Sequence, residues 1–252
     1  MESPENQKLK PAEQFNAGHK EYTPFIETDP IRNFLHYPSV IKELGEVSGK
    51  RILDIGCGDG LFDRKLAMDY GARVVGYDIS PNLVAKAQQS ENDKPLGIHY
   101  EVADPATFRA NEPFDGAVTV MVFPYAPDEE YLKNFFASAY ANLKVGGKFV
   151  SITFNPQFDT FNKVIMNRYF RKGEGNKIGF DFLELQTGEV KFSAELAQFS
   201  QADYEQAARD GGFRKIEWKF PEPTEEGAQK LGAKFWQKAD NERPYAIIVA
   251  EK

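Results

Sequence analysis

The sequence predicts an α/β fold in which a mostly parallel, Rossmann-like sheet carries helices on both faces. Three observations support this prediction. An apolar strand at Arg51–Ile55 runs directly into a glycine-rich turn and a helix, strands and helices then alternate as far as residue 154, and aspartates end successive expected strands. Such alternation is typical of parallel sheets with right-handed crossovers. A ligand is therefore expected at the carboxyl edge of the sheet.

Local signals place the individual elements. The helix after the glycine turn shows Phe62, Leu66 and Tyr70 on one face and ends at Gly71. Ser80 and Pro81 supply an N-cap and a first-turn residue for the next helix. The expected strands are 51–55, 73–77, 98–103, 117–122, 149–154, 216–220 and 245–249, and the helices among the first five are 61–70, 81–90 and 128–145.

Two segments interrupt this regular pattern. Residues 1–10 are polar and are expected to be disordered, and residues 11–49 are expected to form a helical cap, or lid, with a helix that begins at Asp29-Pro30 and breaks or restarts at Tyr37-Pro38. Residues 156–199 are expected to be an insertion on the substrate side, with a helix over 158–171 and two extended runs within 179–200. A capping box at 200–203 and a helix over 225–238 complete a single domain of residues 11–252.

Composition excludes several classes of protein. The chain has 252 residues, a formal net charge of −7 and no dense run of Lys or Arg, which disfavours nucleic acid and anionic membranes as partners. No apolar stretch is long enough to span a bilayer, and the single cysteine, Cys57, cannot form an internal disulfide. A cytoplasmic protein, as a monomer or a homodimer, is expected. The 21 Phe residues suit either a core or an aromatic pocket for a flat substrate.

The glycine turn indicates the kind of ligand. Its spacing is G-x-G-x-G, which differs from the G-x-G-x-x-G of dinucleotide sites, and Asp54 and Asp59 would repel a phosphate. S-adenosylmethionine carries a sulfonium and a ribose but no phosphate, so it suits such a turn. Asp78, at the end of the next strand, is placed to accept hydrogen bonds from ribose hydroxyls, and Asp104 to accept one from the adenine amine.

These residues resemble the class I S-adenosylmethionine-dependent methyltransferases. The resemblance covers about residues 50–155 and is carried by Asp54–Gly60, Val75–Ser80, Val102–Asp104 and Leu143–Phe149. It implies a seven-stranded sheet with an antiparallel last strand and S-adenosylmethionine as cofactor, with no metal. The implied cofactor-binding residues are Asp54, Gly56, Cys57, Gly58, Gly60, Asp78, Ile79, Asp104, Val120 and Met121.

A narrower resemblance points to the kind of methyl acceptor. Residues 95–100, Pro124–Ala126, 154–156, 208–213 and 235–236 look like methyltransferases related to the toxoflavin-pathway N-methyltransferase, which act on small heteroaromatic metabolites. Those relatives usually carry Leu-Asn-Tyr-Ala where this chain has Phe123-Pro124-Tyr125-Ala126. The resemblance thus implies a small-molecule acceptor, heteroaromatic or another metabolite, and in-line methyl transfer.

No residue stands out from the sequence as a catalytic base. His19, Tyr22, Tyr125 and Asn155 are the candidates, and no pair of histidines has metal-ligand spacing. Alignment and exclusion of water can supply much of the acceleration, so the sequence leaves open whether a general base is used. The alternatives are a non-catalytic S-adenosylmethionine-binding protein and a nucleic-acid methyltransferase. The second would carry Asn or Asp before Pro-Pro-Tyr, where this chain has Val122-Phe123-Pro124-Tyr125.

Overall fold

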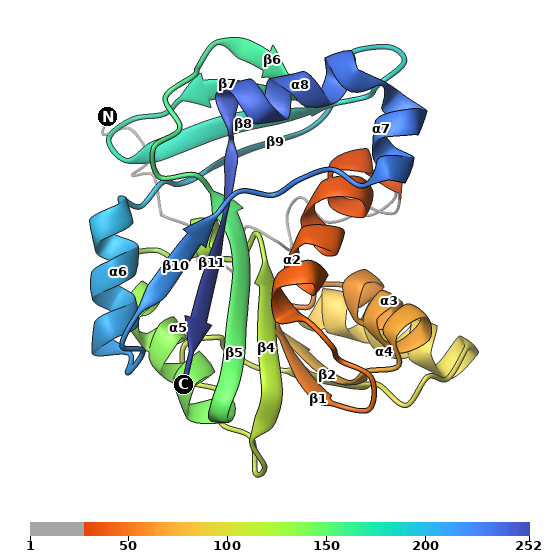
Figure 1. Cartoon of the computed structure of the whole chain (residues 1–252), viewed down its shortest axis with the longest axis vertical. Helices are drawn as coiled ribbons and strands as arrows, with labels where there is room; N and C mark the ends of the chain where they lie inside the picture. The colour runs from red at the N-terminus through yellow and green to blue at the C-terminus, as the bar shows by residue number, and fades with distance from the viewer. Residues whose placement is uncertain (1–27) are drawn as a thin grey trace, which may run out of the picture.

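The computed structural model describes residues 28–252, which form two sheets stacked one above the other (Figure 1). The larger sheet has seven strands in the order β10-β11-β5-β4-β1-β2-β3. Its strands are β1 (Arg51–Ile55), β2 (Arg73–Asp78), β3 (His99–Val102), β4 (Phe114–Val120), β5 (Leu143–Phe154), β10 (Ile216–Lys219) and β11 (Tyr245–Glu251). The expected regions 1–10 and 11–27, including a short helix before residue 22, lie outside the described residues.

The pairing confirms the predicted sheet. β3, β2, β1, β4 and β5 run parallel, whereas β11 is antiparallel to β5 and β10 to β11. The strand order reverses between β1 and β4, which is the switch point where open α/β sheets bind ligands. The turns that follow β1 and β4 therefore meet at one place on the sheet edge.

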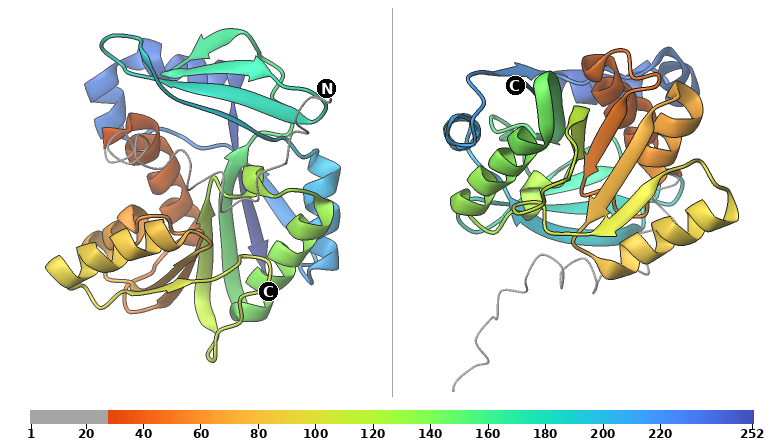
Figure 2. Two further views of the ribbon diagram at one scale, coloured as in Figure 1. Left: turned by 180° about the vertical axis from the view of Figure 1, so that it is seen from behind. Right: turned by 90° about the horizontal axis from the view of Figure 1, so that it is seen from below.

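Helices cover both faces of this sheet, as predicted (Figure 2). Along β1, Ile52 packs into one apolar cluster and Leu53 and Ile55 into the other, because strand side chains alternate between faces. The first cluster includes α2 (Tyr37–Leu44), α3 (Leu61–Tyr70) and α4 (Pro81–Asp93), and the second α5 (Glu129–Asn142) and α6 (Gln201–Asp210). Tyr70 is an exception to the predicted face, since it is 37% exposed at the end of α3.

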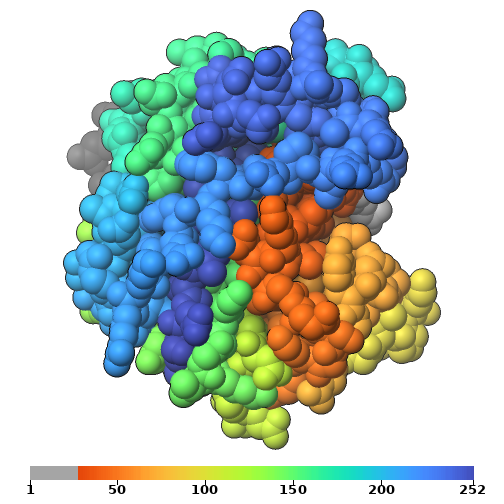
Figure 3. Space-filling model, viewed as in Figure 1, coloured from red at the N-terminus to blue at the C-terminus, as the bar shows by residue number. Residues whose placement is uncertain are grey.

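The helix that begins near Asp29-Pro30 is not broken at Tyr37-Pro38. It passes through a π-helical turn, η1 (Arg32–His36), directly into α2, which ends at Gly45 in a left-handed conformation. Pro38 has no amide N–H to bond the carbonyl of Phe34, so this carbonyl accepts a hydrogen bond from the Thr224 amide instead (2.8 Å). The segment before α7 is thereby fastened onto this helix, and Figure 3 shows the two regions packed against each other.

The insertion after β5 is a second sheet, which corrects the prediction of a helix over 158–171. Its antiparallel strands are β6 (Lys163–Ile165), β7 (Arg168–Lys172), β8 (Lys177–Leu183) and β9 (Val190–Ala197). Met166 has a φ of 56°, and the turn there reverses the chain after three strand residues, so no helix can continue. The two extended runs around residues 186–189 are confirmed as β8 and β9.

The remaining elements broadly agree with prediction, although α5 ends at Asn142 and β5 begins at Leu143, where the helix was expected to continue to residue 145. Ser200 and Asp203 form the predicted capping box of α6. The predicted helix over 225–238 is two helices, α7 (Glu225–Leu231) and α8 (Ala233–Glu242), because Gly232 adopts a φ of 78° between them. A short turn, η2 (Phe123–Tyr125), follows β4. None of the helices in residues 28–252 is long and apolar enough to cross a bilayer.

Candidate functional site

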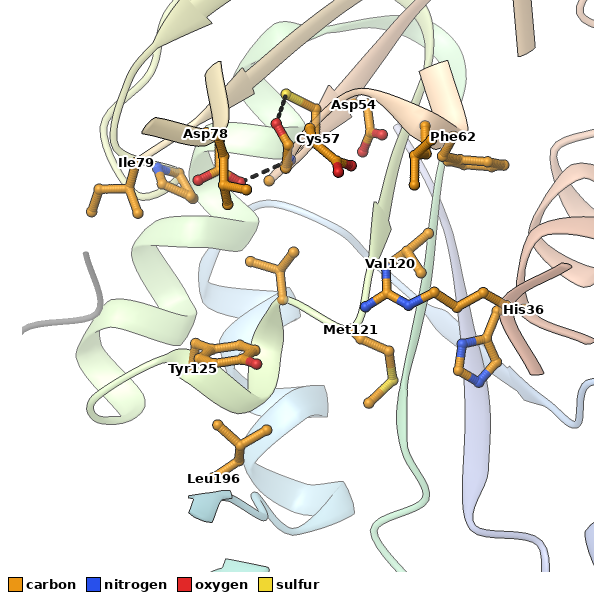
Figure 4. Close-up of a pocket in the computed structure, with 18 of the residues that line it drawn as sticks. His36, Asp54, Cys57, Phe62, Asp78, Ile79, Val120, Met121, Tyr125 and Leu196 are labelled. Atoms are coloured by element: carbon orange, nitrogen blue, oxygen red, sulfur yellow. Dashed lines mark hydrogen bonds between the residues drawn. The ribbon is translucent and has the colours of Figure 1, made fainter. Parts of the chain in front are cut away.

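A cavity lies at the switch point of the large sheet and is covered by the small sheet. It encloses about 1200 Å³, its open mouth included. One end is formed by the turn after β1, the end of β2 and the start of α4, and the other by η1, β7, β8, β9 and β11. Figure 4 shows Asp54, Cys57 and Asp78 on one side and His36, Met121, Tyr125 and Leu196 away from them. We call these two parts the acidic end and the aromatic end.

The glycine turn has the backbone conformation that its sequence demands. Gly56, Gly58 and Gly60 have φ values of 78°, 60° and 78°, in the left-handed region that favours glycine. The amides of Gly56 and Cys57 both donate to the carbonyl of Tyr77, at 2.8 and 3.0 Å. A Cβ on Gly56 would lie 2.4 Å from the Val122 side chain, whereas one on Gly58 would meet nothing within 4 Å. The turn is thus packed at Gly56 and open at Gly58.

Asp78 fastens this turn to the neighbouring strand. It lines the cavity at the end of β2, and one carboxylate oxygen accepts the Gly58 amide (3.0 Å) while the other accepts the Ser80 amide (2.9 Å). Burial raises the pKa of Asp78, and these backbone donors oppose the rise. Each oxygen keeps acceptor capacity for a ligand hydroxyl, since a carboxylate oxygen has two lone pairs.

A second buried acid lies beside Asp54 and was not foreseen from the sequence. Asp63 on α3 is fully buried, and its carboxyl interacts with the charge of Asp54. Burial, and then the Asp54 charge, raises the pKa of Asp63 well above its usual range, and burial raises the pKa of Asp54 to about 7. Burial and mutual repulsion therefore oppose simultaneous ionisation of the two carboxyls. The available signal was position: Asp63 lies three residues before Leu66, on the buried face of α3.

The other predicted cofactor residues are only partly brought together. Cys57, Ile79, Val120 and Met121 line the cavity. Burial raises the pKa of Cys57 well above its usual range, so it is a neutral thiol. Gly60 and Asp104 do not line the cavity.

Asp104 does not reach the cavity, and its carboxylate is instead hydrogen-bonded to a residue that does. Its Oδ1 atom accepts the Tyr131 hydroxyl (2.9 Å) and the Ala106 amide (2.8 Å), and Tyr131 itself lines the cavity. Tyr131 is thus the residue through which Asp104 can act on a ligand.

The aromatic end is built from segments far apart in the sequence. Phe154 stacks on Tyr245 with ring centroids 6.0 Å apart and meets Phe180 edge to face at 5.5 Å. Phe182 and Tyr125 contribute further rings to the lining. These rings come from β5, β8, β11 and η2, so a wide apolar wall faces the space under the small sheet.

A buried ion pair supports this wall. Arg168 on β7 and Asp29 are 2% and 3% exposed, and their side chains meet at 2.6 Å. The Arg168 guanidinium also lies 3.5 Å above the centroid of the Phe182 ring and lines the cavity. Sequence reasoning missed this pair because 139 positions separate its members and nothing local connects them.

His36 on η1 is the other unpredicted residue of the aromatic end. It is 3% exposed, lines the cavity, and neither ring nitrogen has a hydrogen-bond partner within the described residues. Its ring meets Tyr245 edge to face at 4.4 Å. Burial, together with the Arg32 and Arg168 charges, holds the pKa of His36 well below its usual range. The imidazole is therefore neutral at physiological pH.

The predicted catalytic candidates divide three ways. Tyr125 lines the cavity, at the edge of η2. Asn155 does not: it donates to the Arg243 carbonyl (2.9 Å) and accepts the Gln157 amide (3.0 Å), so its polar groups serve a loop. His19 and Tyr22 lie outside the described residues. Among residues 28–252, no cluster of three His, Cys, Asp or Glu side chains could hold a metal ion.

Sequence comparisons agree with this geometry. Residues 52–147 match the family described as "Methyltransferase domain". The chain is 29% identical over 174 residues to the ubiquinone biosynthesis O-methyltransferase of Coxiella burnetii (strain RSA 331 / Henzerling II), covering 68% of this chain and 66% of that protein. It is 30% identical over 174 residues to phosphoethanolamine N-methyltransferase 2 of Caenorhabditis elegans, covering 63% and 39%. The chain thus spans less than two thirds of either relative.

Solved structures share the fold. An S-adenosylmethionine-dependent methyltransferase from Mesorhizobium loti superposes with a TM-score of 0.60 at 24% identity, covering 85% of this chain and 96% of that one. Phosphoethanolamine N-methyltransferase 2 of Haemonchus contortus, in complex with phosphomonomethylethanolamine and S-adenosylhomocysteine, superposes with a TM-score of 0.60 at 16% identity, covering 97% and 60%. Residues 52–147 therefore match a methyltransferase domain, and the chain shares the fold of solved S-adenosylmethionine-dependent methyltransferases.

Proposed function

We propose that this protein transfers the methyl group of S-adenosylmethionine to a small, flat acceptor molecule held at the aromatic end of the cavity. One observation carries the proposal. The glycine turn with its acids and an aromatic wall built by separate segments open into the same enclosed space. A protein that only bound the cofactor would have no need of the aromatic end of the cavity.

The acidic end fits S-adenosylmethionine. Its oxygen acceptors are Asp54 and Asp78, and Asp54 Oδ1 is buried without a hydrogen-bond partner within residues 28–252. Such an acid-rich pocket suits the ammonium and sulfonium groups and hydroxyl donors, and it opposes phosphate. Asp54 and the turn amides would hold the amino-acid part, Asp78 the ribose, and Ile79 one face of the adenine. When bound, the cofactor supplies an already activated methyl group.

The aromatic end suits an acceptor that is small and flat. The rings of Phe154, Phe180, Phe182 and Tyr245 present an apolar, edge-rich surface on which a planar molecule can pack. The small sheet covers this space from above, so that the two reactants would be held together. Positioning of this kind can supply about 7–11 kcal/mol of the barrier reduction. The relatives named for ubiquinone biosynthesis and phosphoethanolamine support a small molecule as acceptor.

Two measurements test the proposal. In a thermal-shift assay, S-adenosylhomocysteine should stabilise the protein, by about 2.7 kcal/mol at one hundred times its Kd, and NAD should not. Formation of S-adenosylhomocysteine from S-adenosylmethionine should then depend on an added aromatic acceptor. Stabilisation by NAD alone would refute the cofactor assignment. Stabilisation by S-adenosylhomocysteine with no turnover across a broad panel of acceptors would instead favour a cofactor-binding protein without catalysis.

A further inference from the structure

His36 is a buried imidazole that no protein group satisfies. Both ring nitrogens are sealed from solvent and lack a hydrogen-bond partner within residues 28–252, although the side chain lines the cavity. A buried polar group without a partner is costly, so one that persists next to a cavity points to a ligand group that completes it. In Figure 4 His36 lies beside Met121 on the side of the cavity away from Asp78.

The groups packed around His36 come from four parts of the chain. Arg32 is on the same helix, Arg168 approaches from β7 with its partner Asp29, and Tyr245 contacts the ring from β11. The next residue, Tyr37, is hydrogen-bonded to Arg32 and is buried. The charged neighbours that act on the imidazole are guanidiniums, and they favour its neutral form. A neutral imidazole has a free lone pair and can accept a proton.

We infer that His36 is the catalytic base, which takes the proton from an O–H or N–H nucleophile of the acceptor as the methyl group is transferred. This inference rests on the proposed function. In the balanced step, a lone pair of the acceptor atom forms the bond to the methyl carbon. The electrons of the broken carbon–sulfur bond stay on sulfur, and the acceptor's proton moves to an imidazole nitrogen.

Charge balance in the cavity explains how His36 can act as a base although its pKa is low. Methyl transfer converts a cationic sulfonium into a neutral thioether, so one positive charge disappears from the cavity. If His36 takes the proton, one positive charge appears there, and the sum does not change. Before transfer, by contrast, a protonated His36 would add a cation to a space that already holds a sulfonium and the Arg32 and Arg168 guanidiniums. The site therefore opposes protonation before the reaction and tolerates it afterwards.

This argument gives a test that needs no acceptor. The pKa of His36 can be measured by NMR in the full chain with labelled histidine, in complex with S-adenosylhomocysteine and with sinefungin, a cationic analogue with an amine near the sulfonium position. We expect the His36 pKa to be lower by about one pH unit in the sinefungin complex. His99 is an internal control because it is exposed on β3, at the opposite end of the strands from the cavity. Resonances are assigned with His36→Gln and His99→Gln.

A second test uses acceptors that differ in whether they must lose a proton. The probes are 3,4-dihydroxybenzoate, which must lose an O–H proton, and quinoline, whose ring nitrogen carries no proton. His36→Gln should lower kcat for 3,4-dihydroxybenzoate by about 10²–10⁴-fold and leave KM for S-adenosylmethionine and turnover of quinoline within a few-fold of wild type. His99→Gln should leave all values unchanged. Equal losses with quinoline and with 3,4-dihydroxybenzoate would show a packing role only.

The outcomes separate this inference from the proposed function. If neither cofactor analogue binds, the proposed function fails. If both bind and the His36 pKa is the same in the two complexes, the inference is overturned while cofactor binding stands. The NMR comparison can therefore overturn the inference even if neither probe is turned over.

Discussion

The two ends of the cavity differ in how the chain builds them. The lining of the acidic end comes from the turn after β1, the end of β2 and the start of α4, all within residues 54–83. The aromatic end draws on η1, β5, β7, β8 and β11, from residue 32 to residue 245. The first is a local motif that the sequence displays directly. The second exists only after the chain has folded.

The two ends also differ in electrostatics. Asp54, Asp63 and Asp78 place buried carboxyls at one end, and Arg32, His36 and Arg168 place nitrogen bases and cations at the other. The cavity is therefore polarised along its length, with the acidic end suited to a cation. If the two ends work separately, changes at one should leave the function of the other intact, and a substitution of Arg168 tests this separation directly.

The largest expected effect is at the aromatic end, on stability. Arg168→Met leaves Asp29 buried without its cation, which should cost about 3–5 kcal/mol in the free energy of unfolding, measured by urea denaturation. Arg171→Met on the same strand is the matched control. Arg171 is 44% exposed in its pair with Asp181, so that change should cost at most about 1 kcal/mol.

The same variants address the separation of the two ends. At temperatures where Arg168→Met is folded, its affinity for S-adenosylhomocysteine should equal that of the wild type, since Arg168 touches only the aromatic end. A large loss of cofactor affinity in the folded variant would contradict the division of the cavity into two independent parts.

The next effect concerns the glycine turn. Gly56→Ala forces a Cβ to within 2.4 Å of Val122 at a φ of 78°, which should destabilise the protein by about 2–4 kcal/mol. Gly58→Ala has the same kind of φ but open space, so it should cost only about 1 kcal/mol in stability. Thermal denaturation of the pair separates steric packing from backbone strain. Equal losses in the two variants would mean that the contact with Val122 does not matter.

Asp78 provides the corresponding test of cofactor binding. Asp78→Ala removes the acceptor proposed for the ribose and unties the Gly58 amide, so affinity for S-adenosylhomocysteine should fall by about 1.5–3 kcal/mol, measured by calorimetry. Asp69→Ala, at a 46% exposed position on α3, should leave the affinity unchanged. An unaltered affinity in Asp78→Ala would remove Asp78 from the proposed cofactor site.

The comparison explains how far the sequence could predict this structure. The strands from β1 to β5, the glycine turn and Asp78 follow from local patterns: apolar runs, glycine spacing and an acid at a strand end. The helix predicted over 158–171 was wrong because aromatic and β-branched residues there suit either state, and the turn at Met166 carries no glycine or proline to announce it.

The functional residues of the aromatic end could not be predicted for a different reason. His36 and Arg168 owe their roles to burial and to neighbours more than one hundred positions away, such as Tyr245 and Asp29. A sequence shows the identity of a histidine but not whether its nitrogens are satisfied. Asp63 is an intermediate case, since its helix face could be read but its contact with Asp54 could not.

The smallest effect is a pH dependence at the acidic end. The pKa of Asp63 is raised in the folded protein, so folding binds its proton more tightly than the unfolded chain does. The stability that this proton confers is fully present below about pH 4, the unfolded pKa, and is lost as the pH rises toward the folded pKa, in a window where Asp54, at about 7, also titrates. Asp63→Asn cannot ionise, so its stability should match that of the wild type below about pH 4 and should increasingly exceed it as the pH rises to 8.

Asp115 offers a control of opposite sign. Lys144 and the Arg51 amide lower its pKa, so its contribution is present at neutral pH and is lost as the pH falls through the folded pKa. Asp115→Asn should therefore be less stable than the wild type at pH 7 and approach it under acid conditions, the reverse of Asp63→Asn. Denaturation curves from pH 4 to pH 8 measure both. If Asp63→Asn became less stable than the wild type as the pH rose, Asp63 would have to be ionised and paired in the folded state, and its raised pKa would be contradicted.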